Sequence, residues 1–223
     1  MPTKQKGYKG IPMEGLIATW YAHITAGDAR DFKRNAEAIA GRLRPGARIL
    51  EVAPGPGYLA LELARKGDFR ITGLDISHSF VRIASENARR AGVSIDFHQG
   101  NVSEMPFADG SFDFVVCVAA FKNFVDPLGA LNEIYRVLTP GGAASIQDLR
   151  KDAPPEAVEA EVNGMRLSRL NTALTKLTFR FMLLRNAYSR PALEQLVAAS
   201  RFGTGEILEQ NVGFELRLTK PAH

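Results

Sequence analysis

Apolar runs of strand length recur along the middle of the chain, and segments with helical periodicity separate them. Strands are predicted at residues 44–53, 69–77, 93–101, 112–120 and 143–149. Helices are predicted at residues 58–67, 77–92 and 126–142, with Gly67, Gly92 and a Pro-Gly-Gly turn as their stops. This alternation predicts an α/β fold whose strands form a mostly parallel sheet.

Both ends of the chain break this alternation. Two helices are predicted before the first strand, at residues 12–27 and 28–43. After Leu149 we predict a long helical region at about 154–186, then a helix that begins near Pro191, and two terminal strands. We therefore predict one domain over residues 1–223. Its parts are an N-terminal helical cap (1–44), a cofactor-binding core (45–150), a helical insertion (151–190), and a C-terminal helix with a strand pair (191–223).

Composition and charge narrow the classes of function. Of 223 residues, 45% are hydrophobic and 23% are charged, as in an ordinary globular protein. The net charge is +4 with acids interspersed, without the basic stripe and stacking aromatics of a nucleic-acid enzyme, so no nucleic-acid partner is predicted. The single cysteine, Cys117, excludes an internal disulfide and a multi-cysteine metal site, and we predict no metal. With no apolar run of spanning length and no secretory signal, we expect a cytoplasmic protein.

A glycine-rich turn joins the first predicted strand to the next helix. Gly55, Gly57 and Ala60 satisfy the G-x-G-x-x-G/A spacing that lets the backbone approach a nucleotide. Glu51 precedes this turn, and its carboxylate would repel the pyrophosphate of a dinucleotide. The same carboxylate suits S-adenosylmethionine (SAM), which carries an ammonium and a sulfonium but no phosphate. The alternative is a structural acid held by neighbouring amides.

Two further strand ends carry groups that suit adenosine. Asp75 ends the second strand, where a carboxylate can accept hydrogen bonds from both ribose hydroxyls, although NAD sites use the same device. Asn101 and Val102 follow the third strand. The side-chain carbonyl of Asn101 can meet the exocyclic amine of adenine, and the amide of Val102 can meet a ring nitrogen.

In this order the motifs resemble those of class I SAM-dependent methyltransferases, in particular the small-molecule group that includes the ubiquinone/menaquinone enzymes. "LEVAPGPG", "GLDIS" and "GNVSEMPFADGSFDFV" are similar to the glycine-rich, ribose and adenine motifs of that family, and the resemblance covers about residues 45–150. It implies a Rossmann-like, doubly wound, seven-stranded sheet with an antiparallel C-terminal strand, helical cap elements and SAM as cofactor. The cofactor residues it predicts are Glu51, Ala53, Gly55, Gly57, Asp75, Ile76, Asn101, Val102 and Cys117.

The chain departs from the family pattern within these motifs. Ala53 stands where the family usually has its first glycine, and its methyl group is acceptable if the residue keeps a negative φ. Pro54 and Pro56 flank Gly55 and stiffen the loop. Asn101 replaces the more frequent aspartate and keeps an acceptor without a charge. None of these changes predicts the loss of the cofactor site.

The resemblance places the methyl acceptor beside two other segments. Residues after the fourth strand flank the methyl group in the family, and Phe121, Lys122 and Phe124 are predicted to line a pocket there. This segment lacks the Asn/Asp-Pro-Pro-aromatic sequence with which related enzymes hold a planar amine of DNA or glutamine. Before the first strand, Trp20 and Tyr21 are predicted pocket residues, and His23 is the candidate catalytic base. For each of these residues, plain packing or surface exposure is the alternative.

The region predicted to be helical at 154–186 carries an apolar stripe at helical spacing. Its members are Leu170, Leu174, Leu177, Phe181 and Leu184. Further apolar residues lie off the stripe, and basic residues are interleaved with them. Three interpretations therefore stay open: a cap over a hydrophobic substrate pocket, a homodimer interface, and a helix lying on a membrane surface.

The sequence predicts a SAM-dependent methyltransferase that transfers a methyl group to an O, N or C atom of a small, rather apolar molecule. One alternative is an NAD(P)-dependent oxidoreductase, which Glu51 and the lack of a Tyr-x-x-x-Lys pair after the fourth strand disfavour. The other is a non-catalytic SAM-binding or scaffold protein, which Ala53 and the lack of a clear base keep open.

Overall fold

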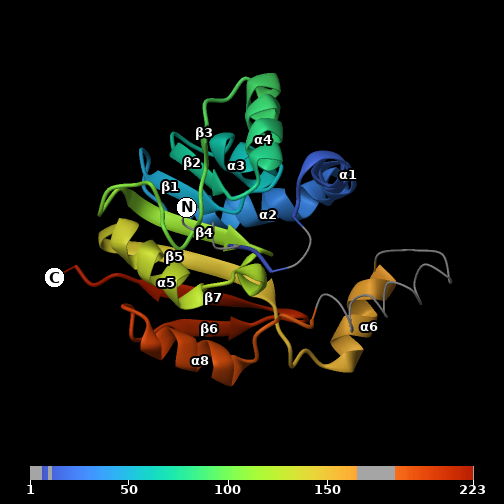
Figure 1. Cartoon of the computed structure of the whole chain (residues 1–223), viewed down its shortest axis with the longest axis vertical. Helices are drawn as coiled ribbons and strands as arrows, with labels where there is room; N and C mark the ends of the chain where they lie inside the picture. Colours follow the sequence, from blue (N-terminus) through green and yellow to red (C-terminus); the bar gives the residue numbers. More distant parts are fainter. Residues whose placement is uncertain (1–6, 10–11, 165–183, 223) are drawn as a thin grey trace, which may run out of the picture.

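The computed structural model describes residues 7–9, 12–164 and 184–222. Within these residues the strands form one seven-stranded sheet in the order β3-β2-β1-β4-β5-β7-β6 (Figure 1). Strands β1 to β5 pair in parallel, whereas β7 is antiparallel to both β5 and β6. The predicted fold class is therefore confirmed. The strands are β1 (Arg48–Val52), β2 (Arg70–Asp75), β3 (Asp96–Gln99), β4 (Phe112–Val118), β5 (Leu138–Leu149), β6 (Glu206–Glu209) and β7 (Gly213–Thr219).

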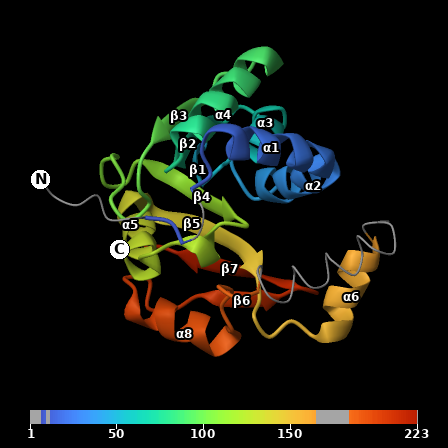
Figure 2. The same ribbon diagram turned by 45° about the vertical axis from the view of Figure 1, so that its right-hand side comes forward.

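Helices cover both faces of this sheet, as a parallel sheet requires. One side carries α1 (Gly15–Thr25), α2 (Ala29–Ala40), α3 (Tyr58–Ala64) and α4 (His78–Ala91) (Figure 2). The other side carries α5 (Pro127–Val137) and α8 (Arg190–Ala199), whereas α6 (Pro155–Gly164) projects beyond the sheet in Figures 1 and 2. None of the described helices is both long enough and apolar enough to cross a membrane.

Each helical layer buries its own apolar stripe against the sheet. Beneath α2 and α3 the core contains Ile39, Leu59 and Leu63. On the opposite face, Leu131 of α5 and Leu193 of α8 belong to the larger core. Helical spacing places these side chains on one face of their helix, which explains why the pattern predicted both layers.

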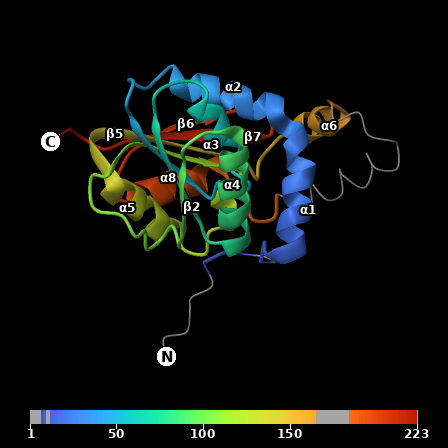
Figure 3. The same cartoon turned by 90° about the horizontal axis from the view of Figure 1, so that it is seen from above.

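The N-terminal helix is attached to the start of α4 (Figure 3). The Glu14 carboxylate accepts hydrogen bonds from the backbone amides of His78 (2.9 Å) and Ser79 (3.0 Å), which are free donors at the first turn of a helix. The amide of Gly15 donates to the Ser79 hydroxyl at 2.9 Å. This connection brings α1 beside the loop that follows β2.

Two predicted helix stops are wrong, whereas the third is confirmed. α3 ends at Ala64, where Arg65 caps it with a right-handed backbone, so Gly67 does not end it. α5 ends at Val137, and the Pro-Gly-Gly sequence lies inside β5, because Leu138 already pairs with Phe112. The register between β4 and β5 then shifts to accommodate the tripeptide. Gly92 does cap α4, with a left-handed φ of 69°.

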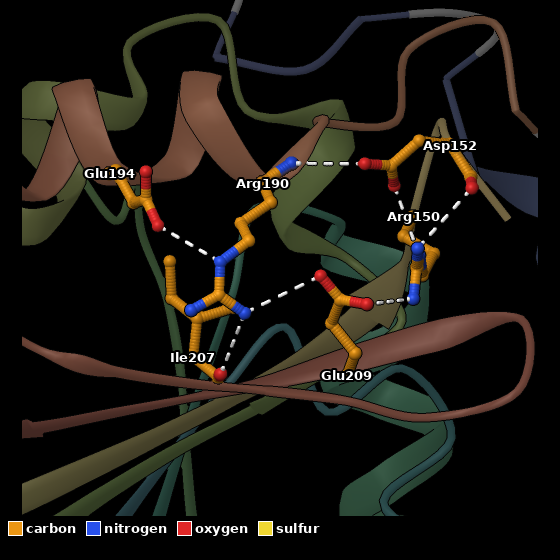
Figure 4. Close-up of polar contacts among 6 residues, drawn as sticks. All are labelled: Arg150, Asp152, Arg190, Glu194, Ile207 and Glu209. Carbon is orange, nitrogen blue, oxygen red and sulfur yellow. Dashed lines mark hydrogen bonds and ion pairs between the residues drawn. The ribbon is translucent and has the colours of Figure 1, made fainter.

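Ion pairs attach the segments that flank residues 165–183 to the edge of the sheet (Figure 4). Arg150 contacts Asp152 at 3.0 Å and also pairs with Glu209 of β6. Arg190, at the start of α8, contacts Glu194 at 2.9 Å and Glu209 at 3.4 Å. These pairs hold the end of β5 and the start of α8 against β6.

The helix predicted at 154–186 is confirmed only for α6, and residues 184–186 form a turn instead. The apolar stripe falls on residues 165–183, which lie outside the described residues, except for Leu184 in the turn. Its three interpretations, as a cap, a dimer interface or a membrane-surface helix, therefore stay predictions.

Candidate cofactor and acceptor site

The predicted cofactor residues meet at the carboxyl ends of adjacent strands. β1 lies between β2 and β4, and Val52 pairs with Leu74 on one side and Cys117 on the other. Glu51 and Asp75 are therefore neighbours at the carboxyl ends of β1 and β2. In open α/β sheets, ligands bind outside the carboxyl ends of the strands, at the point where the strand order reverses.

The turn after β1 has a left-handed backbone at three positions. The φ angles are 54° at Ala53, 55° at Gly55 and 81° at Gly57. Gly57 is also limited in space, because a Cβ there would lie 3.0 Å from the Ala84 side chain and 3.0 Å from the ring of Phe97. Backbone conformation and close packing both require glycine at position 57.

Ala53 does not keep the negative φ on which our prediction depended, so that expectation is wrong. Its amide donates to the carbonyl of Leu74 at 2.8 Å, and this bond holds the strand end against β2. Ala119, just after β4, has a φ of 57°. A left-handed backbone at a residue with a side chain costs about 1–2 kcal/mol. Two neighbouring strands thus end in strained alanines, and such strain concentrates at functional sites.

We expect Ala53→Gly to raise the free energy of unfolding by about 0.5 kcal/mol. Glycine removes the left-handed strain, and its greater freedom in the unfolded chain offsets about 0.4–1 kcal/mol of that gain. Thermal or urea denaturation measures the difference. The matched control is Ala36→Gly in α2, which should instead destabilise by about 1 kcal/mol or more. A loss of stability in Ala53→Gly would contradict the strained backbone.

Glu51 is a buried acid with an unsatisfied oxygen. Its side chain accepts a hydrogen bond from the amide of Ala60, while Oε2 has no hydrogen-bond partner among the described residues. Burial, together with the charge of Asp75, raises the pKa of Glu51 to about 8. A cation beside Oε2 would restore ionisation, whereas a pyrophosphate would oppose it. Glu51 therefore fits the ammonium of SAM.

Asp75 lies close to the glycine turn and is also buried. Its two oxygens accept hydrogen bonds from the amides of Gly55 (3.0 Å) and Ser77 (2.8 Å). Burial nevertheless raises the pKa of Asp75 to about 6. Each carboxylate oxygen can accept more than one hydrogen bond, so both remain suited to ribose hydroxyls.

The predicted adenine residues lie beneath the N-terminal segment. Ile76 is exposed, Val102 is buried, and Asn101 accepts a hydrogen bond from the amide of Ser103 at 3.1 Å. A Cβ at Gly7 would lie 2.6 Å from the Ile76 side chain and 3.1 Å from that of Asn101. The N-terminal segment therefore lies against two of the predicted cofactor residues.

Arg136 of α5 is a supporting residue that the sequence analysis missed. Its guanidinium donates to the carbonyls of Met105 (3.0 Å) and Phe107 (2.7 Å) and pairs with Glu133 and Asp109. These contacts hold the loop that follows Val102. The spacing of three residues between Glu133 and Arg136 predicts an ion pair along one helix. It does not predict that Arg136 contacts the loop that contains Met105 and Phe107.

On the acceptor side, the structure brings together the residues that follow β4. Phe121, Lys122 and Phe124 are all buried, and the two phenylalanine rings contact each other with centroids 5.6 Å apart. Cys117 is buried in β4, and burial raises the pKa of its thiol. The thiol therefore stays protonated.

The predicted residues of α1 are divided between two environments. Tyr21 is half-buried and packs on Phe80 with ring centroids 5.8 Å apart. Trp20 and His23 are exposed. The described contacts therefore do not join His23 to the buried residues after β4.

A groove of about 650 Å³ lies elsewhere on the sheet, and none of the predicted cofactor or acceptor residues lines it. Its lining includes Arg42, Ser145 and Arg217. All three donate hydrogen bonds to the buried carboxylate of Glu215. We therefore interpret these residues as structural.

Comparison with known proteins shows what the middle of the chain is similar to. Residues 50–146 match the family model described as a methyltransferase domain. This segment is less than half of the 223 residues, and over it the chain is similar to methyltransferases. The matched segment runs from β1 into β5 and includes Glu51, Asp75 and Asn101, which are predicted to bind SAM.

The curated relatives are named as methyltransferases of small molecules. A demethylmenaquinone methyltransferase from Deinococcus radiodurans is 38% identical over 120 residues, which cover 53% of this chain and 49% of that protein. A ubiquinone/menaquinone biosynthesis C-methyltransferase from Geotalea daltonii is 37% identical over 150 residues, covering 64% and 63%. A 27-O-demethylrifamycin SV methyltransferase from Amycolatopsis mediterranei is 31% identical over 137 residues, covering 60% and 50%. The chain thus spans about half the length of most of these methyltransferases.

Solved structures agree with the fold. A protein from Methanococcus maripaludis assigned as a SAM-dependent methyltransferase superposes with a TM-score of 0.77 at 23% identity, covering 96% of this chain and 97% of that one. A SAM-dependent methyltransferase from Aquifex aeolicus has a TM-score of 0.64 at 17% identity, covering 82% and 88%. At these identities the similarity shows the fold alone.

Proposed function

We propose that this chain binds SAM and transfers its methyl group to an O, N or C atom of a small, rather apolar molecule. The observation that carries the proposal is the unsatisfied, buried oxygen of Glu51 beside the glycine turn. When bound, SAM supplies an electrophilic methyl group on a sulfonium, and the protein supplies alignment and exclusion of water.

The residues of the site take separate parts in this proposal. Glu51 binds the ammonium, and the left-handed backbone at Gly55 and Gly57 allows close approach of the methionine portion and the ribose. Asp75 accepts hydrogen bonds from the ribose hydroxyls. The adenine binds between Ile76 and Val102, and Asn101 meets its amine. Buried aromatic rings after β4 favour an apolar acceptor, which agrees with the quinone-type and rifamycin names of the relatives.

Calorimetric titration of the purified chain with SAM, S-adenosylhomocysteine and NADH tests the cofactor. We expect micromolar binding of the first two and none of NADH. Asp75→Ala should weaken SAM binding at least tenfold, equal to about 1.4 kcal/mol, because the ribose loses its acceptor. Asp31→Ala, on the exposed surface of α2, is the control and should bind as the parent does. Binding of NADH alone would overturn the proposal in favour of an oxidoreductase, and SAM binding without any methylated acceptor would favour a scaffold.

A further inference from the structure

A buried ion pair lies at the carboxyl ends of β4 and β5, on the acceptor side of the site. Lys122 Nζ is 2.6 Å from Asp148 Oδ1, and the two side chains are 8% and 0% exposed. The backbone amide of Lys122 donates to Asp148 Oδ2 at 2.8 Å. Nζ also donates to the carbonyl of Ala119 at 3.2 Å, the strained residue that ends β4. Asp148 therefore fixes both the backbone and the ammonium of Lys122.

Stability alone gives no reason to keep such a pair. Replacing a buried ion pair by apolar residues of similar volume is often neutral or stabilising, by about 1–4 kcal/mol, because both charges lose their hydration. An ammonium has three donors, and the described contacts of Lys122 use two of them. One N–H is therefore available for a ligand.

Two tyrosines lie against the phenylalanines on either side of Lys122 in the chain. Tyr188 packs on Phe121 with ring centroids 5.5 Å apart, and Tyr8 forms an isolated β-bridge with Phe124. Burial and the charge of Asp148 raise the pKa of Tyr188. Burial, followed by the charges of Tyr21, Asp75 and Asp148, raises the pKa of Tyr8. Both phenols thus stay protonated at neutral pH and can act as hydrogen-bond donors.

The position of Tyr8 links this cluster to the cofactor residues. Gly7 lies against Ile76 and Asn101, and Tyr8 forms a β-bridge with Phe124, so this segment runs from the predicted cofactor residues to the residues after β4. A flat, apolar ring with one charged oxygen would find aromatic walls and donors there. An amine acceptor would instead face the ammonium of Lys122 and the two phenol donors.

We propose that Lys122, positioned by Asp148, binds the ionised oxygen of the methyl acceptor, which is therefore a phenol or an enol and not an amine. Binding lowers the pKa of the acceptor hydroxyl, and its proton leaves to solvent. Tyr8 and Tyr188 complete the donor set. This inference rests on the proposed function, because it assigns the acceptor of the same site.

The test measures binding of 4-nitrophenol to the full chain saturated with S-adenosylhomocysteine. The absorbance of the phenolate, recorded across a range of pH, gives the pKa of the bound phenol. We expect the pKa of the bound phenol to fall, and 4-nitroaniline, which has the same shape, to bind at least tenfold more weakly. Lys122→Met should abolish the pKa shift and weaken 4-nitrophenol about tenfold while leaving S-adenosylhomocysteine affinity within twofold. Lys122→Arg should retain part of the shift.

Lys122→Met leaves Asp148 buried without its cation and could misfold for that reason. A second variant therefore separates a loss of phenol binding from a loss of folding. The double variant Lys122→Met with Asp148→Asn removes both charges and should bind S-adenosylhomocysteine normally without ionising the phenol. An unchanged phenol pKa in the parent chain, or an equal shift in both variants, would overturn the inference. If the parent chain does not bind S-adenosylhomocysteine at all, the proposed function itself fails, and calorimetry separates that result from the others.

Discussion

Glu51→Gln is expected to stabilise the folded chain at pH 8 and to weaken SAM binding in the same protein. The pKa of Glu51 is raised from 4.5 to about 8, so between these values the folded chain holds a proton that the unfolded chain has released. The contribution of Glu51 to stability therefore falls as pH rises through that window. Each pKa unit corresponds to about 1.4 kcal/mol, and after relaxation of the site we expect a gain of about 3 kcal/mol at pH 8.

Urea unfolding at pH 5 and pH 8 measures this effect. The parent and Glu51→Gln should differ little at pH 5, where the buried carboxyl is protonated, and most at pH 8. Asp75, with its pKa raised to about 6, contributes a similar slope at lower pH, but it is present in both proteins and cancels in the comparison. Glu194→Gln, on the exposed surface of α8, is the control and should not gain stability at pH 8. Equal stability differences at both pH values would contradict a raised pKa at Glu51.

Ligand binding gives an independent measure of the same carboxyl. At pH 7 Glu51 is largely protonated, and the ammonium of SAM or S-adenosylhomocysteine should drive its ionisation. Close to one proton is then released per ligand bound, seen as a dependence of the binding enthalpy on the ionisation enthalpy of the buffer. Glu51→Gln should bind at least tenfold more weakly and release no proton from this position. Tight binding without proton release in the parent would mean that the ammonium lies elsewhere.

The fold was predictable because its signals are local and repeated. Strands β1 and β4 are mostly apolar runs, helices α2, α3, α5 and α8 each bury apolar residues, and Gly92 ends α4 as its left-handed backbone requires. The two wrong stops arose from tertiary context. The chain after α5 pairs with β4 at once, which places the Pro-Gly-Gly sequence inside β5.

The candidate site was predictable only in part. The order of the motifs predicted that Glu51, Asp75 and Asn101 lie close together, because the carboxyl ends of neighbouring parallel strands lie at the same end of the sheet. The left-handed backbone of Ala53 could not be predicted, since most alanines keep a negative φ. Asp148 lies 26 residues from Lys122, and the sequence held no sign that β4 and β5 bring them together. Contacts over such separations depend on register, which local pattern does not specify.

A second buried acid, Glu215 of β7, should respond to pH in the opposite direction. Its carboxylate accepts hydrogen bonds from Arg217 (2.8 Å), Arg42 (2.9 Å) and Ser145 (2.9 Å). Burial alone would raise its pKa, but these bonds, led by that from Arg217, lower it to about 2. A carboxyl with a lowered folded pKa stabilises the protein above its ordinary pKa, and this stabilisation is lost as pH falls towards about 2.

Glu215→Ala is expected to lower the free energy of unfolding at pH 7 by about 2 kcal/mol, because Arg42, Ser145 and Arg217 lose their shared acceptor. The lowered pKa of Glu215 would by itself suggest a larger loss of stability. Both arginines are more than a third exposed, however, and solvent screens their attraction to the carboxylate. Glu215→Gln keeps the shape and should cost less. Urea unfolding between pH 7 and pH 3 should show the gap between parent and Glu215→Ala closing only below about pH 4.5, whereas the Glu51→Gln gap, of opposite sign, closes between pH 8 and pH 5. Glu215 is thus stabilised by permanent cationic partners, whereas Glu51 has an oxygen without a partner among the described residues, which we propose binds the ammonium of SAM. A Glu215→Ala gap that did not change with pH would show that the carboxylate acts through packing and not through its charge.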